Sequence, residues 1–191
     1  MVSDFRNNKV NNYSVNACIA PLASVDNCAV TTVEGIGMRK GELEGIQKEM
    51  VAADGSQCGF CTSGMVMTMY TLIRNFKKVT NKQLHQALQG NLCRCTGYRP
   101  ILEAFKNTKV LCGLGEKCCR NNSEKMDSKD STFVPPSKSQ EPIFPPALRK
   151  TEKTWKIFTG KSITWYAPEN LADLAKLKSR MPEAKLITGK H

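Results

Sequence analysis

The sequence predicts a mainly α-helical protein in which one four-helix domain is flanked by smaller segments. Three observations support this fold class. Between residues 42 and 110, apolar residues recur at three- and four-residue steps, which is the spacing of one helix face. Residues 1–35 are polar or β-branched and carry short strand patterns. After residue 111, a stretch rich in glycine, proline and serine precedes a short α+β pattern.

Residues 1–35 are expected to contain two strands and one short helix. One strand is expected near Lys9–Val15, in an asparagine-rich stretch. Small apolar residues at 17–27 predict a short helix. The β-branched run near Cys28–Val33 predicts a second strand, which ends in a glycine turn. These elements make residues 1–35 the β part of the predicted fold.

The domain at residues 36–111 is expected to hold four helices, the first two joined by a cysteine loop. Gly55 can cap the end of the first helix. Thr62 or Ser63 can cap the start of the second, which is expected to run to about Asn75. The apolar face of the first helix comprises Leu43, Ile46, Met50 and Val51. The apolar stripe of the second comprises Met65, Val66, Met69, Leu72 and Ile73.

The last two helices of this domain have their own start signals. Thr80 and Gln83 form the pattern of a capping box, and Gly90 is expected to end that helix. Pro100 stands at a first-turn position of the fourth helix. The buried sides are expected to comprise Leu84, Ala87, Leu88, Ile101, Leu102 and Phe105. The two cysteine pairs of the domain therefore fall in the loops between helices.

The C-terminal part reads as a linker followed by a small α+β segment. Residues 112–146 carry glycine, proline, serine and mixed charge, which is typical of a linker. Within residues 147–191, two short strands are expected around residues 159–161 and a helix at 169–182. The inward positions of that helix are expected to be Leu171, Leu174 and Leu177. A last strand is expected at residues 184–191.

The composition argues against several classes of partner. The 191 residues carry a net charge of +11, but the basic residues are scattered and do not alternate with stacking aromatics, so no nucleic-acid partner is expected. No run of eighteen apolar residues and no apolar signal core occurs, so neither membrane insertion nor secretion is expected. The nine cysteines are then expected to be thiols in the reducing cytoplasm.

Four of these cysteines form a tight pattern, Cys58-x-x-Cys61 and Cys93-x-Cys95. Zinc and a 2Fe–2S cluster both take four cysteine sulfurs. The spacing favours the cluster over zinc, because Cys-x-Cys is shorter than a usual zinc knuckle and a helix pair separates the two motifs. Buried unligated cysteines are a weaker alternative. A thioredoxin-like redox pair is weaker still, since no βαβ pattern surrounds the motif.

Longer stretches around these cysteines resemble the iron–sulfur segment of the xanthine dehydrogenase and aldehyde oxidase family of molybdenum hydroxylases. The stretches are "GSQCGFCTSGMVMTMYTLIRN" and "GNLCRCTGYRPILEAF". The resemblance is dense over residues 14–108 and looser over 140–189. It implies that residues 36–111 form a helical 2Fe–2S-binding domain. It also implies that residues 1–35 are the remnant of a plant-type ferredoxin-like domain, and residues 147–191 the truncated start of an FAD-binding domain.

The resemblance also implies roles for individual residues. The cluster ligands would be Cys58, Cys61, Cys93 and Cys95. Gln57 would hydrogen-bond the molybdopterin, and Cys95 would also lie against the pterin. The cluster would then carry single electrons from molybdenum towards flavin. Ser63 stands where the family usually has proline, and a serine that can cap a helix should cost little there.

The chain departs from the family pattern at both ends. Cys18 matches one ligand of a first cluster whose other ligands are missing, so it is expected to be a half-buried orphan thiol. Cys28 has no assigned role. The linker residues Cys112, Cys118 and Cys119 are expected to be exposed thiols, and His85 a surface residue.

The chain is therefore expected to be a fragment that does not catalyse a reaction alone. The implied parent is a homodimeric enzyme of the cytoplasm or peroxisome that hydroxylates a purine or an aldehyde through its molybdopterin and FAD domains. Two alternatives stay open. One is a zinc-binding or cluster-free structural fragment, and the other is the non-functional product of a truncated gene model.

Overall fold

The structure is a computed structural model that describes residues 1–37, 45–76, 79–108, 143–151 and 155–187. The chain divides into two compact units. One comprises Met1 with Thr31–Ile143, and the other Val2–Val30 with Phe144–His191. No helix in the described part of the chain is long and apolar enough to cross a membrane. The predicted linker lies outside the described residues up to residue 142, as do Cys112, Cys118 and Cys119.

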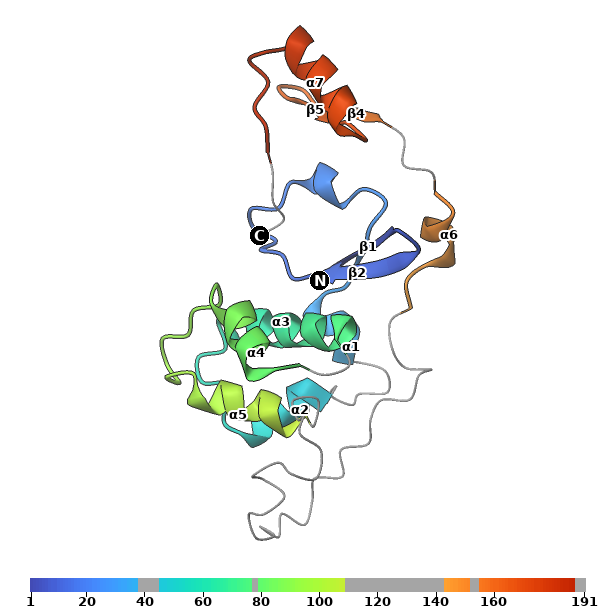
Figure 1. Ribbon diagram of the computed structural model, residues 1–191. Helices are drawn as coiled ribbons and strands as arrows, with labels where there is room; N and C mark the ends of the chain where they lie inside the picture. The colour runs from blue at the N-terminus through green and yellow to red at the C-terminus, as the bar shows by residue number, and fades with distance from the viewer. Residues whose placement is uncertain (38–44, 77–78, 109–142, 152–154, 188–191) are drawn as a thin grey trace. The chain divides into compact units, whose positions relative to one another are not determined.

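The first unit is a small helical domain (Figure 1). Its helices are α1 (Val33–Gly37), α2 (Gly45–Ala52), α3 (Thr62–Asn75), α4 (Asn81–Leu88) and α5 (Arg99–Asn107). Helix α2 packs against α5, and α3 packs against α4, α2 and α1. The four predicted helices are thus present, and the predicted turn after residue 33 is instead the short helix α1.

The core of this unit is formed by the apolar faces that the helical periodicity predicts. Its buried residues are Ile46, Met50, Met65, Val66, Met69, Tyr70, Leu72, Val79, Leu84, Leu88, Ile101, Ala104 and Phe105. One position among the described residues was predicted wrongly, because Val51 is 65% exposed; the predicted core residue Leu43 lies outside the described residues. Helix α2 is only eight residues long and turns a single face, with Ile46 and Met50, to the core. Ile73, Ala87 and Leu102 are partly buried at the edge of the core.

The helix caps agree with the sequence at one site and differ at two. The capping box of Thr80 and Gln83 is present, with each side chain bonded to the backbone of the other residue. The N-cap of helix α3 is instead Cys61, which makes no side-chain cap hydrogen bond. The expected cap Thr62 bonds to the hydroxyl of Ser56, at 2.7 Å.

The end of helix α2 is the second difference. The residue in the left-handed conformation is Asp54, with φ 53°, and not Gly55. The N–H of Gly55 donates to the carbonyl of Met50 at 2.8 Å, and the N–H of Asp54 to Val51 at 3.1 Å. This pair of bonds is a Schellman motif, which satisfies the last carbonyls of a helix.

The second unit contains two small antiparallel sheets. Strand β1 (Val2–Arg6) lies between β2 (Lys9–Tyr13) and the short β3 (Ala29–Val30), and the 3₁₀ helix η1 (Leu22–Val25) precedes β3. Strand β1 was not predicted. It pairs with β2 through a turn in which Asn7 and Asn8 both have positive φ, which suits a tight hairpin. The strand expected at Cys28–Val33 is shorter, since Val33 opens α1.

The remaining elements of the second unit follow residue 143. They are α6 (Pro146–Arg149), the hairpin of β4 (Lys156–Thr159) and β5 (Thr164–Ala167), and α7 (Leu171–Arg180). Leu177 is buried in α7, whereas Leu171 is 79% exposed at its first turn and was predicted wrongly as an inward residue. The strand expected at 184–191 is absent as far as the structure describes it, through residue 187.

Candidate metal centre

The loop between α2 and α3 carries Cys58 and Cys61, and close packing sets its direction. The Schellman motif turns the chain away from α2 at Asp54. Gly55 is buried there, and a Cβ on it would lie 3.0 Å from the Met50 sulfur. The loop then turns at Gly59, whose φ of 81° favours glycine, and the N–H of Thr62 donates to its carbonyl. Cys61 therefore lies directly at the N-terminus of α3.

The second loop, between α4 and α5, carries Cys93 and Cys95 and is tied to α3. The side-chain amide of Asn91 donates to the hydroxyl of Thr68 in α3, at 3.1 Å. A Cβ on Gly64 would lie 2.9 Å from the Asn91 side-chain oxygen, so glycine permits this approach. Neither Asn91 nor Gly64 was singled out from the sequence. Gly64 itself was the available signal. Glycine weakens a helix, so its presence in the first turn indicates that close packing leaves no room for a side chain there.

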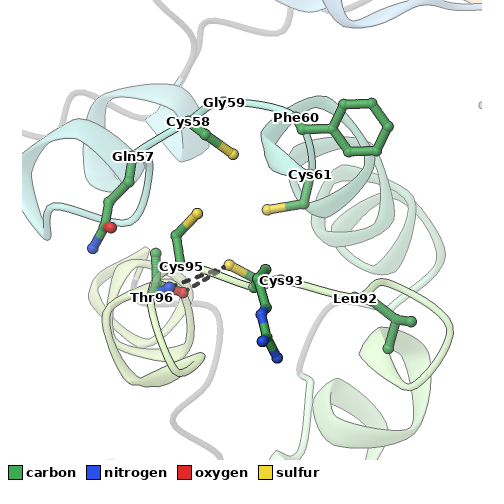
Figure 2. Close-up of a pocket in the computed structure, with 10 residues that line it drawn as sticks. Gln57, Cys58, Gly59, Phe60, Cys61, Leu92, Cys93, Cys95 and Thr96 are labelled. Carbon is green, nitrogen blue, oxygen red and sulfur yellow. Dashed lines mark hydrogen bonds between the residues drawn. The ribbon is translucent and has the colours of Figure 1, made fainter.

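The two loops bring all four predicted cysteines to one pocket. Figure 2 shows the sulfurs of Cys58, Cys61, Cys93 and Cys95 directed towards a common space between the loops. In their effect on pKa, Cys58 interacts with Cys95, and Cys61 with Cys93. Each interacting pair therefore takes one sulfur from each loop.

The rim of this pocket combines apolar and polar side chains. Phe60 and Leu92 are exposed large apolar residues beside the cysteines. Gln57 and Arg94 also line the pocket and are exposed. The Gln57 side chain extends away from the four sulfurs in Figure 2. The pocket thus opens to the surface, and its rim is available to a neighbouring group.

In each cross-loop pair, the pKa of one thiol is lowered and that of the other is raised. The hydroxyl and then the N–H of Thr96 lower the pKa of Cys93 to about 7. Burial, followed by the hydrogen bond to Cys93, raises the pKa of Cys61 to about 11. In the other pair, the N–H of Phe60 and the Cys95 thiol lower the pKa of Cys58, and the bond to Cys58 raises that of Cys95. A cysteine binds a metal as its thiolate, so metal binding would displace the protons of these thiols.

The arrangement of the thiols fits two metal ions better than one. The four thiols line one pocket and interact in two cross-loop pairs. A 2Fe–2S cluster takes two thiolates on each iron, whereas structural zinc needs four ligands around one point. The donor set and its pairing therefore suit a two-iron cluster.

The other residues singled out from the sequence do not join this pocket. Cys18 belongs to the second unit and is exposed, so the expectation of a half-buried thiol was wrong. The N–H of Cys18 donates to the side-chain oxygen of Asn16 at 3.3 Å, so this short turn engages the backbone of Cys18 and not its thiol. Cys28 is half-buried and its sulfur lies 3.4 Å from the carbonyl of Asp26. His85 is exposed on α4, as predicted.

Thr96 and Tyr98 also contact Cys93, and neither was singled out from the sequence. The N–H of Cys93 donates to the phenol oxygen of Tyr98 at 3.0 Å, and the Thr96 hydroxyl lies 3.0 Å from the Cys93 sulfur. The available signal was a hydroxyl side chain three residues after a ligand candidate, within reach of its sulfur. Such contacts are common around metal-bound cysteines because they orient the ligand.

Comparison with known proteins supports the same chemistry. The profile of the 2Fe-2S binding domain family matches residues 32–106. Xanthine dehydrogenase of Calliphora vicina is 47% identical over 97% of this chain and 15% of its own length. Aldehyde oxidase 4 of Mus musculus is 42% identical over 99% of this chain and 16% of its own length.

A solved structure also matches part of the chain. The crystal structure of quinoline 2-oxidoreductase from Pseudomonas putida 86 matches at 31% identity with a TM-score of 0.45, over 49% of this chain and 57% of that chain. By contrast, the chain spans about 15% of the length of the curated xanthine dehydrogenases that it matches.

Proposed function

We propose that this chain, which belongs to the xanthine dehydrogenase and aldehyde oxidase family, holds one 2Fe–2S cluster and relays single electrons through it. The ligands in this proposal are Cys58, Cys61, Cys93 and Cys95. The observation that carries it is the convergence of these four thiols from two loops on one pocket. The family match at residues 32–106, which includes all four, supports the same assignment.

The cross-loop pairs support one distribution of the sulfurs over the two irons. Cys58 and Cys95 would hold one iron, and Cys61 and Cys93 the other, since these thiols shift one another's pKa. A cluster held in this way joins α3 to α5 through their N-terminal loops. When bound, it supplies one-electron transfer, while the chain supplies the ligands, their hydrogen bonds and the pocket.

The proposed electron donor and acceptor lie outside this chain's pocket. By the family resemblance, electrons would come from a molybdopterin that Gln57 and Cys95 face, and would leave towards FAD. The exposure of both residues at the pocket rim supports this assignment. Residues 147–191 would open the FAD-binding domain, and residues 1–35 would belong to a ferredoxin-like domain. The whole protein would hydroxylate a purine or an aldehyde as a homodimer.

Metal analysis of the chain purified without oxygen tests the proposal. We expect a red-brown protein with about two irons and two sulfides per chain. The variant Cys93→Ser should lose the colour, while Cys28→Ser should keep it, because Cys28 lies outside the pocket. A colourless protein with one zinc per chain would instead establish the structural alternative. Unchanged colour in Cys93→Ser would exclude the proposed ligand set.

A further inference from the structure

The loop that carries Cys93 closes on itself through hydrogen bonds of Thr96 and Tyr98. The phenol oxygen of Tyr98 accepts from the N–H of Cys93 at 3.0 Å. The N–H of Tyr98 donates to the Thr96 hydroxyl oxygen at 3.2 Å. That hydroxyl in turn lies 3.0 Å from the Cys93 sulfur, which also accepts from the Thr96 N–H at 3.5 Å. Cys93 is therefore held at both its backbone nitrogen and its sulfur.

The backbone of this loop is arranged for these contacts at a conformational cost. Gly97 and Tyr98 both have positive φ, 66° and 70°. A left-handed conformation is unfavourable for tyrosine, by about 1 kcal/mol or more. Tyr98 is also packed against the helical core and is the N-cap of α5, so the surrounding structure compensates for this cost. The strained residue places the Thr96 hydroxyl and the phenol oxygen around one cysteine.

The direction of the sulfur contact follows from the neighbouring bond. A metal-bound cysteine sulfur has no proton, so it can only accept from the Thr96 hydroxyl. The hydroxyl oxygen already accepts from the N–H of Tyr98, which leaves its own proton to be donated. The other three cysteines have sulfur or backbone partners in place of a hydroxyl, within the contacts that the structure describes. The hydroxyl thus acts at one sulfur of four.

We propose that Thr96 is a positioning residue whose hydroxyl donates to the Cys93 sulfur and raises the reduction potential of the bound cluster. Reduction adds negative charge, and part of that charge lies on the cysteine sulfurs. A hydrogen bond to a sulfur stabilises that charge and so favours the reduced state. The proposal rests on the proposed function, because it requires the 2Fe–2S cluster to be bound.

The test compares the reduction potentials of full-chain variants loaded with the cluster. Thr96→Val removes the hydroxyl but keeps the branched shape and the backbone N–H. Thr96→Ser restores a hydroxyl. The matched control is Thr62→Val, since Thr62 adjoins Cys61 but its hydroxyl bonds to Ser56 and not to a sulfur. Midpoint potentials come from redox titrations followed by electron paramagnetic resonance, and iron–sulfur stretching frequencies from resonance Raman spectra.

We expect Thr96→Val to bind as much iron and sulfide as the wild-type chain and to have a lower midpoint potential. Its stretching frequencies should shift, while Thr96→Ser and Thr62→Val should resemble the wild type. An unchanged potential in Thr96→Val would overturn the proposal, as would an equal shift in Thr62→Val.

Failure of the variants to load also gives a decisive result. If Thr96→Val does not retain the cluster, Thr96→Ala is measured in its place. Loss of the cluster from both, with retention in Thr96→Ser, would show that the hydroxyl holds Cys93 in place, and would overturn the tuning role. A wild-type chain without iron would instead overturn the proposed function itself, so the two failures are distinguishable.

Discussion

The helical unit and the strand-containing unit bury different kinds of side chain. The helical interior is mostly apolar and includes Met65, Met69, Leu84, Ile101 and Phe105 at 0% exposure, with threonine as its buried polar residue type. In the second unit, the buried residues around β1 include Ser3, Asp4 and Asn12 beside Val2. The Ser3 hydroxyl lies 2.7 Å from the Asn12 side-chain oxygen, and Asp4 pairs with the exposed Arg6 at 2.9 Å.

This difference shows how the four thiols can lie at the surface and still be held in fixed positions. The apolar core holds the ends of α2, α3, α4 and α5, and the cysteine loops connect those ends. The loops need only short polar contacts, such as Asn91 to Thr68, to complete their positions. Around β1, by contrast, the buried polar groups are already occupied by hydrogen bonds such as that of Ser3 to Asn12.

The two units can be followed separately in one sample. Both tryptophans of the chain, Trp155 and Trp165, belong to the second unit. Tryptophan fluorescence therefore reports on that unit, whereas far-ultraviolet circular dichroism is dominated by the helices. A variant that changes only one unit should therefore shift only one of these two signals. A variant that shifts both together would argue against two separately folding units.

Removal of iron is expected to have the largest effect, and only on the helical unit. The proposed cluster joins the loops at the N-termini of α3 and α5, so chelation should lower the free energy of unfolding of this unit by several kcal/mol, on the order of a structural metal site. Urea titrations with and without a chelator measure this change. The tryptophan transition should not move, and an equal shift in both transitions would contradict the prediction.

Phe105→Ala is expected to have the next largest effect. The side chain is 0% exposed at the centre of the helical core, so its loss should cost about 3–5 kcal/mol through lost burial and an unfilled cavity. Circular dichroism at increasing urea measures the change. Phe76→Ala is the matched control in the same unit, because Phe76 is 41% exposed and should cost clearly less. Similar costs for both variants would show that the core is not packed as described.

Two helix caps should give the smallest effects, one in each unit. Thr80→Ala removes the capping box of α4 and should destabilise the helical unit by about 1 kcal/mol. Asn170→Ala removes the side-chain oxygen that accepts from the N–H of Asp173 at the start of α7, with a similar cost to the second unit. Each variant should shift one of the two unfolding signals. A shift of the circular dichroism transition alone by both would argue against separate units.

The helical part of the fold was largely predictable because its signals are local. The periodicity of α3, and the capping box of α4, depend on residues within one or two turns of one another. Strand β1 escaped prediction because its signal lies in its partner and in the two asparagines of the turn. The cap at Asp54 was assigned to Gly55 because glycine is the usual residue in that conformation. The structure uses Gly55 for its small size against Met50 instead.

The sequence by itself determined which residues form the candidate site, because the spacing of Cys58, Cys61, Cys93 and Cys95 has few chemical explanations. Only the tertiary structure decided which sulfurs meet. The packing of α3 with the loop at Asn91 places Cys58 opposite Cys95 and Cys61 opposite Cys93. It also decided the hydrogen bond of Thr96 to Cys93, which depends on the left-handed backbone at Gly97 and Tyr98. Spacing along a chain limits which atoms can meet, but the packing of helices sets their distances.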